Sequence, residues 1–462
     1  MNNPTLTKLD PLSEMLALSS YGNTKNIIIT AIETRGPLDE EGLIQEAKRA
    51  ASSFPQILSR LKEIKEKGRY HLFWEYRPDE VLPVRITDMK TADGTVSLDQ
   101  FLSHVSGRLD RDWNLFEEPA SEFHFVRLSA DHHILSVAVH HAAADGVTAS
   151  EFGKEVFANY HELKTGQRPD WASDTPALSS SGKRRVKVKK PNWKKVLEGV
   201  RQTLVRLTDK PSLPAGDGSN SDTRQYNIKR VLSVEDSDRI VKKALERGVS
   251  PVGLLAADAG RAVDYWNAEH NVAPGLLTIS MTVNMRGRFR GLDRPNTGGV
   301  IFFRSMPQDR EDVAAFTRSI AAKRIGHFRR QEDYTYYSDV SRMTDSLRIF
   351  PFNTRRKIVN FIVNRYQLSM AVTLLGVIWP KLENGKITAD TYLTRTGDLE
   401  IDQVHGTGYK LLSSTRALLI AYFYKKQLNV VLAASACQFT YEQAEAFTDL
   451  IVKDLIEPPL IT

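Results

Sequence analysis

The chain has 462 residues, of which 41% are hydrophobic and 26% charged, the balance of an ordinary globular protein with about two or three compact units. Its formal net charge of +7 suits acidic partners and falls short of the extreme typical of nucleic-acid-binding proteins, so we expect no nucleic acid partner. Residues 1–10 lack an apolar leader and no run reaches the roughly 20 apolar residues that span a bilayer, which predicts a cytoplasmic protein.

Strand-like and helix-like patterns alternate through the first part of the chain. Residues 26–34 are rich in β-branched side chains and end at Gly36 and Pro37, which predicts a strand followed by a turn. A helix is predicted to open with the acidic residues 39–41. We predict further strands at 70–76, 81–86, 122–128 and 133–139 and a helix at 147–163. Residues 140–146 therefore lie between a predicted strand and a predicted helix.

The pattern changes near residue 175. Residues 183–195 carry eight Lys or Arg, and 211–222 are rich in Gly, Pro, Ser and Asp. We interpret 176–222 as a flexible connection between lobes, with one short basic helix around 192–207. A charge run of this kind is typical of a solvated linker. The other interpretation is that 183–206 docks an acidic carrier protein or a membrane surface.

A second set of elements follows residue 223. We predict helices at 233–248 and 251–267, a strand at 276–283, and a later helix leading into a strand at 371–379. Cys437 closes an apolar, strand-like run, and we expect it to be a buried structural thiol. A single cysteine also excludes an internal disulfide. The predicted domains are therefore 1–175, the connection 176–222, and 223–462.

The most informative residues are His140-His141-Ala142-Ala143-Ala144-Asp145-Gly146. A histidine in this loop is a candidate proton-transfer group because its ordinary pKa lies near neutrality. Adjacent histidines at a strand end point in opposite directions, so one can face a cleft while the other packs inside. Asp145 could orient the histidine or hold the loop by pairing with an arginine, and the sequence alone leaves both open. Gly146 is predicted to adopt a backbone geometry that other residues resist.

A metal site is the first alternative, because histidines also occur at 132 and 133. If residues 133–139 form a strand, its rise separates the two histidine pairs by roughly 20 Å, and one ion cannot join them. We therefore expect no metal. The chain also lacks a Gly-x-Ser-x-Gly elbow, a P-loop and a dinucleotide fingerprint, which disfavours hydrolysis, phosphoryl transfer and hydride transfer.

The motif His-His-x-x-x-Asp-Gly at 140–146 resembles the signature of the condensation-domain and chloramphenicol-acetyltransferase-like superfamily of acyltransferases. Other segments also resemble that superfamily, so the resemblance extends over essentially the whole chain; they are 26–33, 54–60, 113–115, 283–288 and 295–299. Within the superfamily, the chain resembles a standalone condensation enzyme or a polyketide-associated acyltransferase. The Asp-Phe-Gly-Trp-Gly segment of the plant branch is absent, which argues against that branch.

The resemblance implies an α/β fold with two chloramphenicol-acetyltransferase-like lobes in a V-shaped pseudo-dimer around a central tunnel. It implies that His141 is catalytic, either as general base or as a positioning residue, and that His140 and Gly146 are structural parts of the motif. Asp145 would be turned from the site and bridged to an arginine. Arg286 is the first candidate for that bridge and Arg288 the second.

The resemblance further implies transfer of an acyl group from a phosphopantetheine thioester to a hydroxyl or amine, forming an ester or amide in secondary-metabolite or lipid biosynthesis. The donor would be an acyl or peptidyl carrier protein or acyl-CoA, with no permanently bound cofactor. We expect a monomer. The alternatives are a non-catalytic scaffold that binds carrier proteins and a lipid-synthesis enzyme that contacts membranes through 183–206 and 350–365.

Overall fold

A computed structural model describes most of the chain. The described residues are 4–22, 24–77, 79–89, 96–172, 208–219, 221–285, 296, 298–330, 332–383, 386–410 and 415–457. The basic helix predicted around 192–207 and the docking segment 183–206 lie outside these residues, and so do Arg286 and Arg288.

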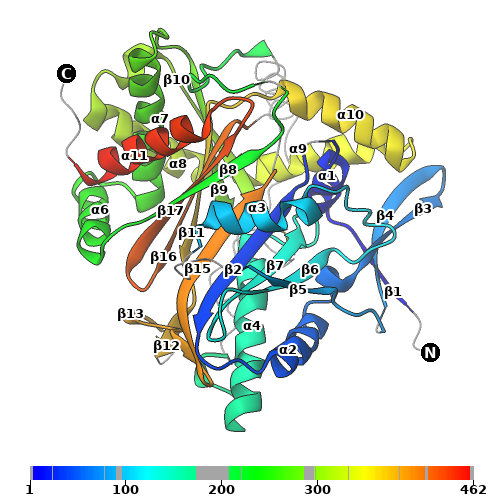
Figure 1. The fold of residues 1–462 in the computed structure, drawn as a ribbon. Coiled ribbons are helices and arrows are strands. Elements are labelled where there is room, and N and C mark those ends of the chain that lie inside the picture. Colours follow the sequence, from blue (N-terminus) through cyan, green and yellow to red (C-terminus); the bar gives the residue numbers. More distant parts are fainter. Residues whose placement is uncertain are drawn as a thin grey trace.

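One six-stranded sheet, called the first sheet, carries the histidine motif (Figure 1). Its strand order is β14-β15-β2-β7-β6-β5, and neighbours run antiparallel except for the parallel pair β5 and β6. β7 is buried along its whole length and β2 along all but its last residue, so both occupy the core. The strands are β2 (Ile27–Arg35), β5 (Val84–Asp88), β6 (Ser121–Arg127), β7 (His132–His140), β14 (Arg395–Thr396) and β15 (Leu399–Tyr409).

A second six-stranded sheet, called the second sheet, has the order β10-β9-β11-β16-β17-β8. β11 runs parallel to both of its neighbours, and the other pairs are antiparallel. Its strands are β8 (Gln225–Val231), β9 (Leu277–Asn284), β10 (Gly298–Ser305), β11 (Met370–Val377), β16 (Ala417–Tyr424) and β17 (Gln427–Ser435). The chain also forms a smaller sheet of β1 (Thr5–Lys8), β4 (Arg69–Tyr76) and β3 (Arg60–Glu66), and a hairpin of β12 (Pro380–Glu383) and β13 (Lys386–Tyr392).

Helices cover both large sheets. α2 (Glu40–Ser52) and α4 (Gly146–Thr165) pack together beside β2 (Figure 1). Around the second sheet lie α6 (Val234–Glu246), α7 (Pro251–Glu269), α8 (Val313–Arg330) and α11 (Tyr441–Ile456). α1 (Pro11–Ser19) packs against α9 (Glu332–Leu347) and α10 (Phe352–Arg365), while α3 (Leu98–Leu109) contacts β8 of the second sheet. Among the described residues, no helix is long and apolar enough to cross a membrane.

The later part of the chain returns to the first sheet. β15 pairs with β2 from Glu400 opposite Arg35 to Tyr409 opposite Ile27, with an irregular register near its start. Trp379 is also 1% exposed in the core around the first sheet, and its indole N–H donates to the Ser150 carbonyl in α4 at 3.0 Å. The sequence predicted domains divided at residues 175 and 222. It did not indicate that β15, from the second predicted domain, pairs with β2 in the first. The boundaries themselves stay a prediction.

The architecture confirms the predicted α/β class, and the predicted strands at 26–34, 122–128 and 133–139 are β2, β6 and β7. Cys437 differs from its prediction. β17 ends at Ser435, and Cys437 lies two residues beyond it, partly exposed, with its Sγ 3.0 Å from the Ser435 hydroxyl. The apolar run continues in sequence after the pairing with neighbouring strands has ended, so the expectation of a buried strand thiol was wrong.

Candidate active site

The histidine motif lies where β7 ends and α4 begins. His140 is the last residue of β7 and is paired with Ile27 of β2. The backbone N–H of His141 donates to the Asn26 carbonyl at 2.6 Å, and the N–H of Ala143 donates to the His140 carbonyl at 2.8 Å. These bonds fix the loop to the first sheet, so the position of the His141 side chain is set by the core of the fold.

His140 is the packed histidine of the pair. It is fully buried, and its Nδ1 accepts a hydrogen bond from the Ala142 N–H at 3.1 Å. Burial, reinforced by the neighbouring His141, lowers the pKa of His140 to about 3. His140 is therefore neutral near pH 7, and its contact shapes the turn that follows β7.

His141 is the more exposed of the two, half-buried where His140 is enclosed. Burial lowers the pKa of His141, while backbone groups of His141 and Ala144 and the charge of Asp145 oppose the shift. Its Nδ1 is buried, and the described part of the chain offers it no hydrogen bond of good geometry. A neutral imidazole near pH 7 can accept a proton, which is what a general base requires.

Asp145 begins α4. It is 9% exposed, and its Oδ1 accepts the Thr148 backbone N–H at 3.0 Å, the contact of a helix N-cap. This contact fastens the end of the motif loop to a 20-residue helix. The predicted bridge to Arg286, or to Arg288, falls outside the described residues and stays a prediction.

The structure gives a different reason for a glycine at position 146 from the one predicted. It is the first residue of α4 and is not among the glycines with positive φ. A Cβ built at this position would lie 3.1 Å from Cδ2 of Leu375 in β11. The expectation of an unusual backbone geometry was therefore wrong. Glycine at this position instead allows a strand of the second sheet to approach the motif closely.

A second residue from the later part of the chain reaches the motif. The Asn296 side-chain N–H donates to the His141 carbonyl, and Asn296 is 1% exposed. The same amide nitrogen lies 3.5 Å from the Ser13 hydroxyl, and the amide Oδ1 is buried with no hydrogen-bond partner among the described residues. The sequence indicated the surrounding segment through its resemblance, but nothing in the sequence singled out Asn296 itself.

Among the described residues, one group has the composition of a metal site. Ligand atoms of Glu33, His132 and Asp402 lie within 4.8 Å of one another. These atoms already contact protein groups: Glu33 Oε1 lies 2.6 Å from His132 Nε2, its Oε2 lies 3.4 Å from His405 Nε2, and Asp402 pairs with Arg35. His132 lies at the start of β7 and His141 just beyond its end, so this group is remote from the motif loop.

Comparison with known proteins gives three findings. A family model described as Condensation domain matches residues 17–278. Bacitracin synthase 2 of Bacillus licheniformis is 26% identical over 177 residues, a match that covers 36% of this chain and only 6% of that protein. The first condensation domain of the calcium-dependent antibiotic synthetase, with a substrate analogue, is 14% identical with a TM-score of 0.66, covering 99% of this chain and 98% of that one.

A further likeness in fold is to an acetyltransferase. Trichothecene 15-O-acetyltransferase TRI3 from Fusarium sporotrichioides has a TM-score of 0.67 at 12% identity, covering 98% of this chain and 95% of that one. At such low identity the solved structures show a shared fold alone. They confirm the predicted α/β fold of the condensation and chloramphenicol-acetyltransferase type.

Proposed function

We propose, since this chain belongs to the condensation-domain family, that it transfers an acyl group from a phosphopantetheine thioester to an amine or hydroxyl. Acyl transfer in general is supported by the family and by the likeness to an acetyltransferase. The thioester donor is supported by the family and by the likeness to the condensation domain of the calcium-dependent antibiotic synthetase. The donor is a carrier protein or acyl-CoA, and the net charge of +7 suits either of these acidic partners.

The observation that carries the proposal is the difference in environment between His140 and His141 at the end of β7. His140 is enclosed and bonded to the loop, while His141 is half-buried and neutral. In the proposed step, the imidazole of His141 takes the proton of the attacking amine or hydroxyl as that group bonds to the thioester carbonyl. The tetrahedral intermediate then expels the thiolate, which takes the proton from the imidazolium. The product is an amide or ester and a free thiol.

The other motif residues hold His141 in place in this proposal. Asp145 fastens the loop to α4, and Gly146 admits Leu375 beside it. Asn296 holds the His141 carbonyl from the other side. We further propose that Arg286 pairs with Asp145, and that donor and acceptor approach His141 from opposite mouths of a tunnel between the lobes.

The test is thiol release coupled to product detection. Purified protein is incubated with a panel of acyl-CoA and acyl-carrier donors and pooled amines and alcohols, and free thiol and acylated product are measured by mass spectrometry. We expect equal amounts of both from the wild type and a loss of about 10²- to 10⁴-fold in His141→Ala. His71→Ala, on the separate three-stranded sheet, is the matched control and should keep its activity.

Full activity in a folded His141→Ala variant would refute the catalytic role. No thiol release across the panel, with tight carrier-protein binding retained, would instead support the alternative of a non-catalytic scaffold.

A further inference from the structure

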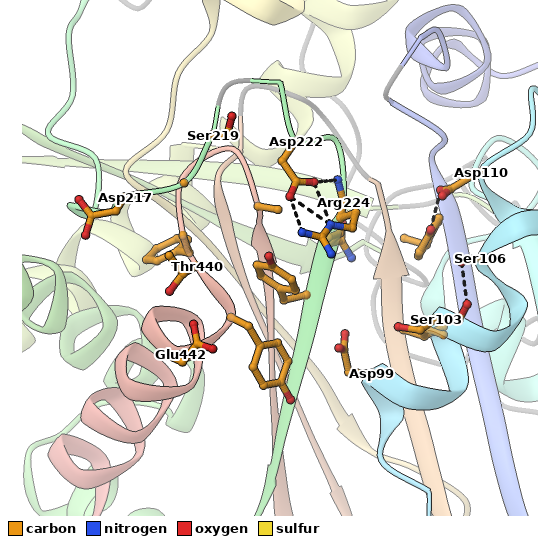
Figure 2. A pocket seen from close by; sticks show the side chains of 18 residues that line it. Asp99, Ser103, Ser106, Asp110, Asp217, Ser219, Asp222, Arg224, Thr440 and Glu442 are labelled. Carbon is orange, nitrogen blue, oxygen red and sulfur yellow. Dashed lines mark hydrogen bonds and ion pairs between the residues drawn. The ribbon is translucent and has the colours of Figure 1, made fainter.

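A cavity of about 660 Å³ opens between four elements: α3, β8, the end of β15 and the start of α11 (Figure 2). Its volume is in the range of small-molecule sites in proteins. Carboxylates and tyrosine rings dominate the wall, and residues far apart in the sequence supply them. Those used in the argument are Asp99, Asp110, Asp222, Tyr226, Tyr441 and Glu442.

The wall is strongly acidic. Five carboxylates line the cavity, and among its described lining residues Arg224 is the only cation. Arg224 is already committed to Asp222, with contacts of 2.7 and 3.1 Å from its guanidinium nitrogens. Asp110 is likewise paired with Lys410 and accepts the Tyr409 hydroxyl at 2.6 Å. The remaining acids are Asp99, Asp217 and Glu442, so the cavity repels phosphate or carboxylate ligands.

Asp99 projects from the first turn of α3 toward the cavity (Figure 2). Its Oδ1 accepts the Asn227 backbone N–H at 3.0 Å, and no ion pair to Asp99 is found among the described residues. Burial raises the pKa of Asp99, and the Asn227 N–H and the charge of Arg224 oppose this rise only in part. A second cation, bound in the cavity, would oppose it further.

Tyrosine rings complete a surface suited to a cation. Tyr226 and Tyr441 meet edge to face, with ring centroids 5.5 Å apart. Both line the same cavity as Asp99, and the Arg224 guanidinium already lies over the Tyr226 ring, 5.9 Å from its centroid. Aromatic faces and carboxylates each attract ammonium and guanidinium groups, and the attraction grows where water is partly excluded. The carboxylates and tyrosine rings of this wall therefore favour the binding of an organic cation.

The cavity is close to the motif. Tyr409 of its wall pairs with Ile27, and Ile27 pairs with His140, so two strand spacings separate Tyr409 from His140, roughly 10 Å. The backbone makes the same connection, because the Lys410 carbonyl accepts the Asn26 N–H at 3.2 Å and the Asn26 carbonyl accepts the His141 N–H at 2.6 Å.

We propose that this cavity binds the cationic end of the acceptor, so that the acceptor carries an ammonium or guanidinium group at one end and its nucleophile at the other. This inference rests on the proposed acyl transfer. A long diamine or a basic amino acid derivative has the required chemistry. The ammonium lies against Asp99 and the Tyr441 ring, and the amine or hydroxyl at the far end reaches His141.

Calorimetric titration of the full chain at low salt tests the site directly. The probe is 1,8-diaminooctane, and 1,8-octanediol, with the same carbon chain and no charge, is its control. We expect saturable binding of the diamine alone, weakened at least about tenfold in Asp99→Asn, where one charge contact is lost. The asparagine keeps an oxygen for the Asn227 N–H. Glu235→Gln, which removes an exposed acid from α6, is the matched control and should bind like the wild type.

Absence of saturable diamine binding, or equal affinities in wild type, Asp99→Asn and Glu442→Gln, would overturn the cation site. Binding should persist in His141→Ala, since that residue is outside the cavity wall. If the diamine binds and no donor yields thiol release, the acceptor role and the proposed function fail while the cation site stands. If acyl transfer occurs and the diamine is no better an acceptor than the diol, the acceptor assignment alone is wrong.

Discussion

Asn296, which lies between β9 and β10 in the sequence, offers a test of whether the later part of the chain holds the catalytic loop. In Asn296→Ala the His141 carbonyl loses its side-chain donor in a buried site, since Asn296 is 1% exposed. A buried acceptor left without its donor costs about 1–3 kcal/mol of the free energy of unfolding. The loop also gains freedom to move, and a displacement of about 1 Å at reacting atoms lowers turnover on the order of 10²-fold. We expect kcat to fall by about 10- to 100-fold with little change in KM.

The matched control is a second buried asparagine with the same chemistry. Asn360 in α10 is 7% exposed, and its side-chain N–H groups donate to the carbonyls of Leu18 at 3.0 Å and Arg356 at 2.8 Å. Asn360→Ala should lose a similar free energy of unfolding in urea and keep its kcat. Equal losses of kcat in both variants, or none in Asn296→Ala, would refute a positioning role for Asn296.

Four further results are expected. Gly146→Ala and Leu375→Ala should be coupled by about 0.5–3 kcal/mol in a double-mutant cycle of urea unfolding, because a Cβ at 146 would lie 3.1 Å from Cδ2 of Leu375 and Leu375→Ala removes that contact. Asp145→Ala should cost at least about 1 kcal/mol in urea unfolding through loss of the N-cap, and an unchanged midpoint would contradict that role. Because the pKa of His140 is lowered to about 3 from an unfolded value near 6.5, the unfolded state binds more protons between these values. Stability should therefore be full above pH 6.5 and fall toward pH 3, less steeply in His140→Gln. As pH falls, activity should be lost only below pH 6.5, because burial also lowers the pKa of His141. Loss of activity already above pH 6.5 would argue against His141 as the base.

Local features of the first sheet could be predicted from the sequence. The β-branched run became β2, and the apolar run before the motif became β7, because such patterns need only short-range periodicity. The separation of the two histidine pairs also followed from strand rise alone. The motif at 140–146 indicated the family, and membership of the family indicated the fold.

Long-range packing could not be predicted in the same way. The pairing of β15 with β2 joins strands more than 360 residues apart, and no local pattern specifies such a partner. The role of Gly146 depends on Leu375, which the fold places beside it from β11. The role of Asn296 depends on the backbone carbonyl of His141, which is far from it in sequence. The acidic cavity is likewise assembled from four separate segments.

The most direct measurement of the central claim is the amount of free thiol released per acylated product by wild type and His141→Ala, with folding of both verified by urea unfolding. The account predicts a one-to-one yield in the wild type and a loss of about 10²- to 10⁴-fold in the variant. Wild-type turnover by folded His141→Ala would contradict it.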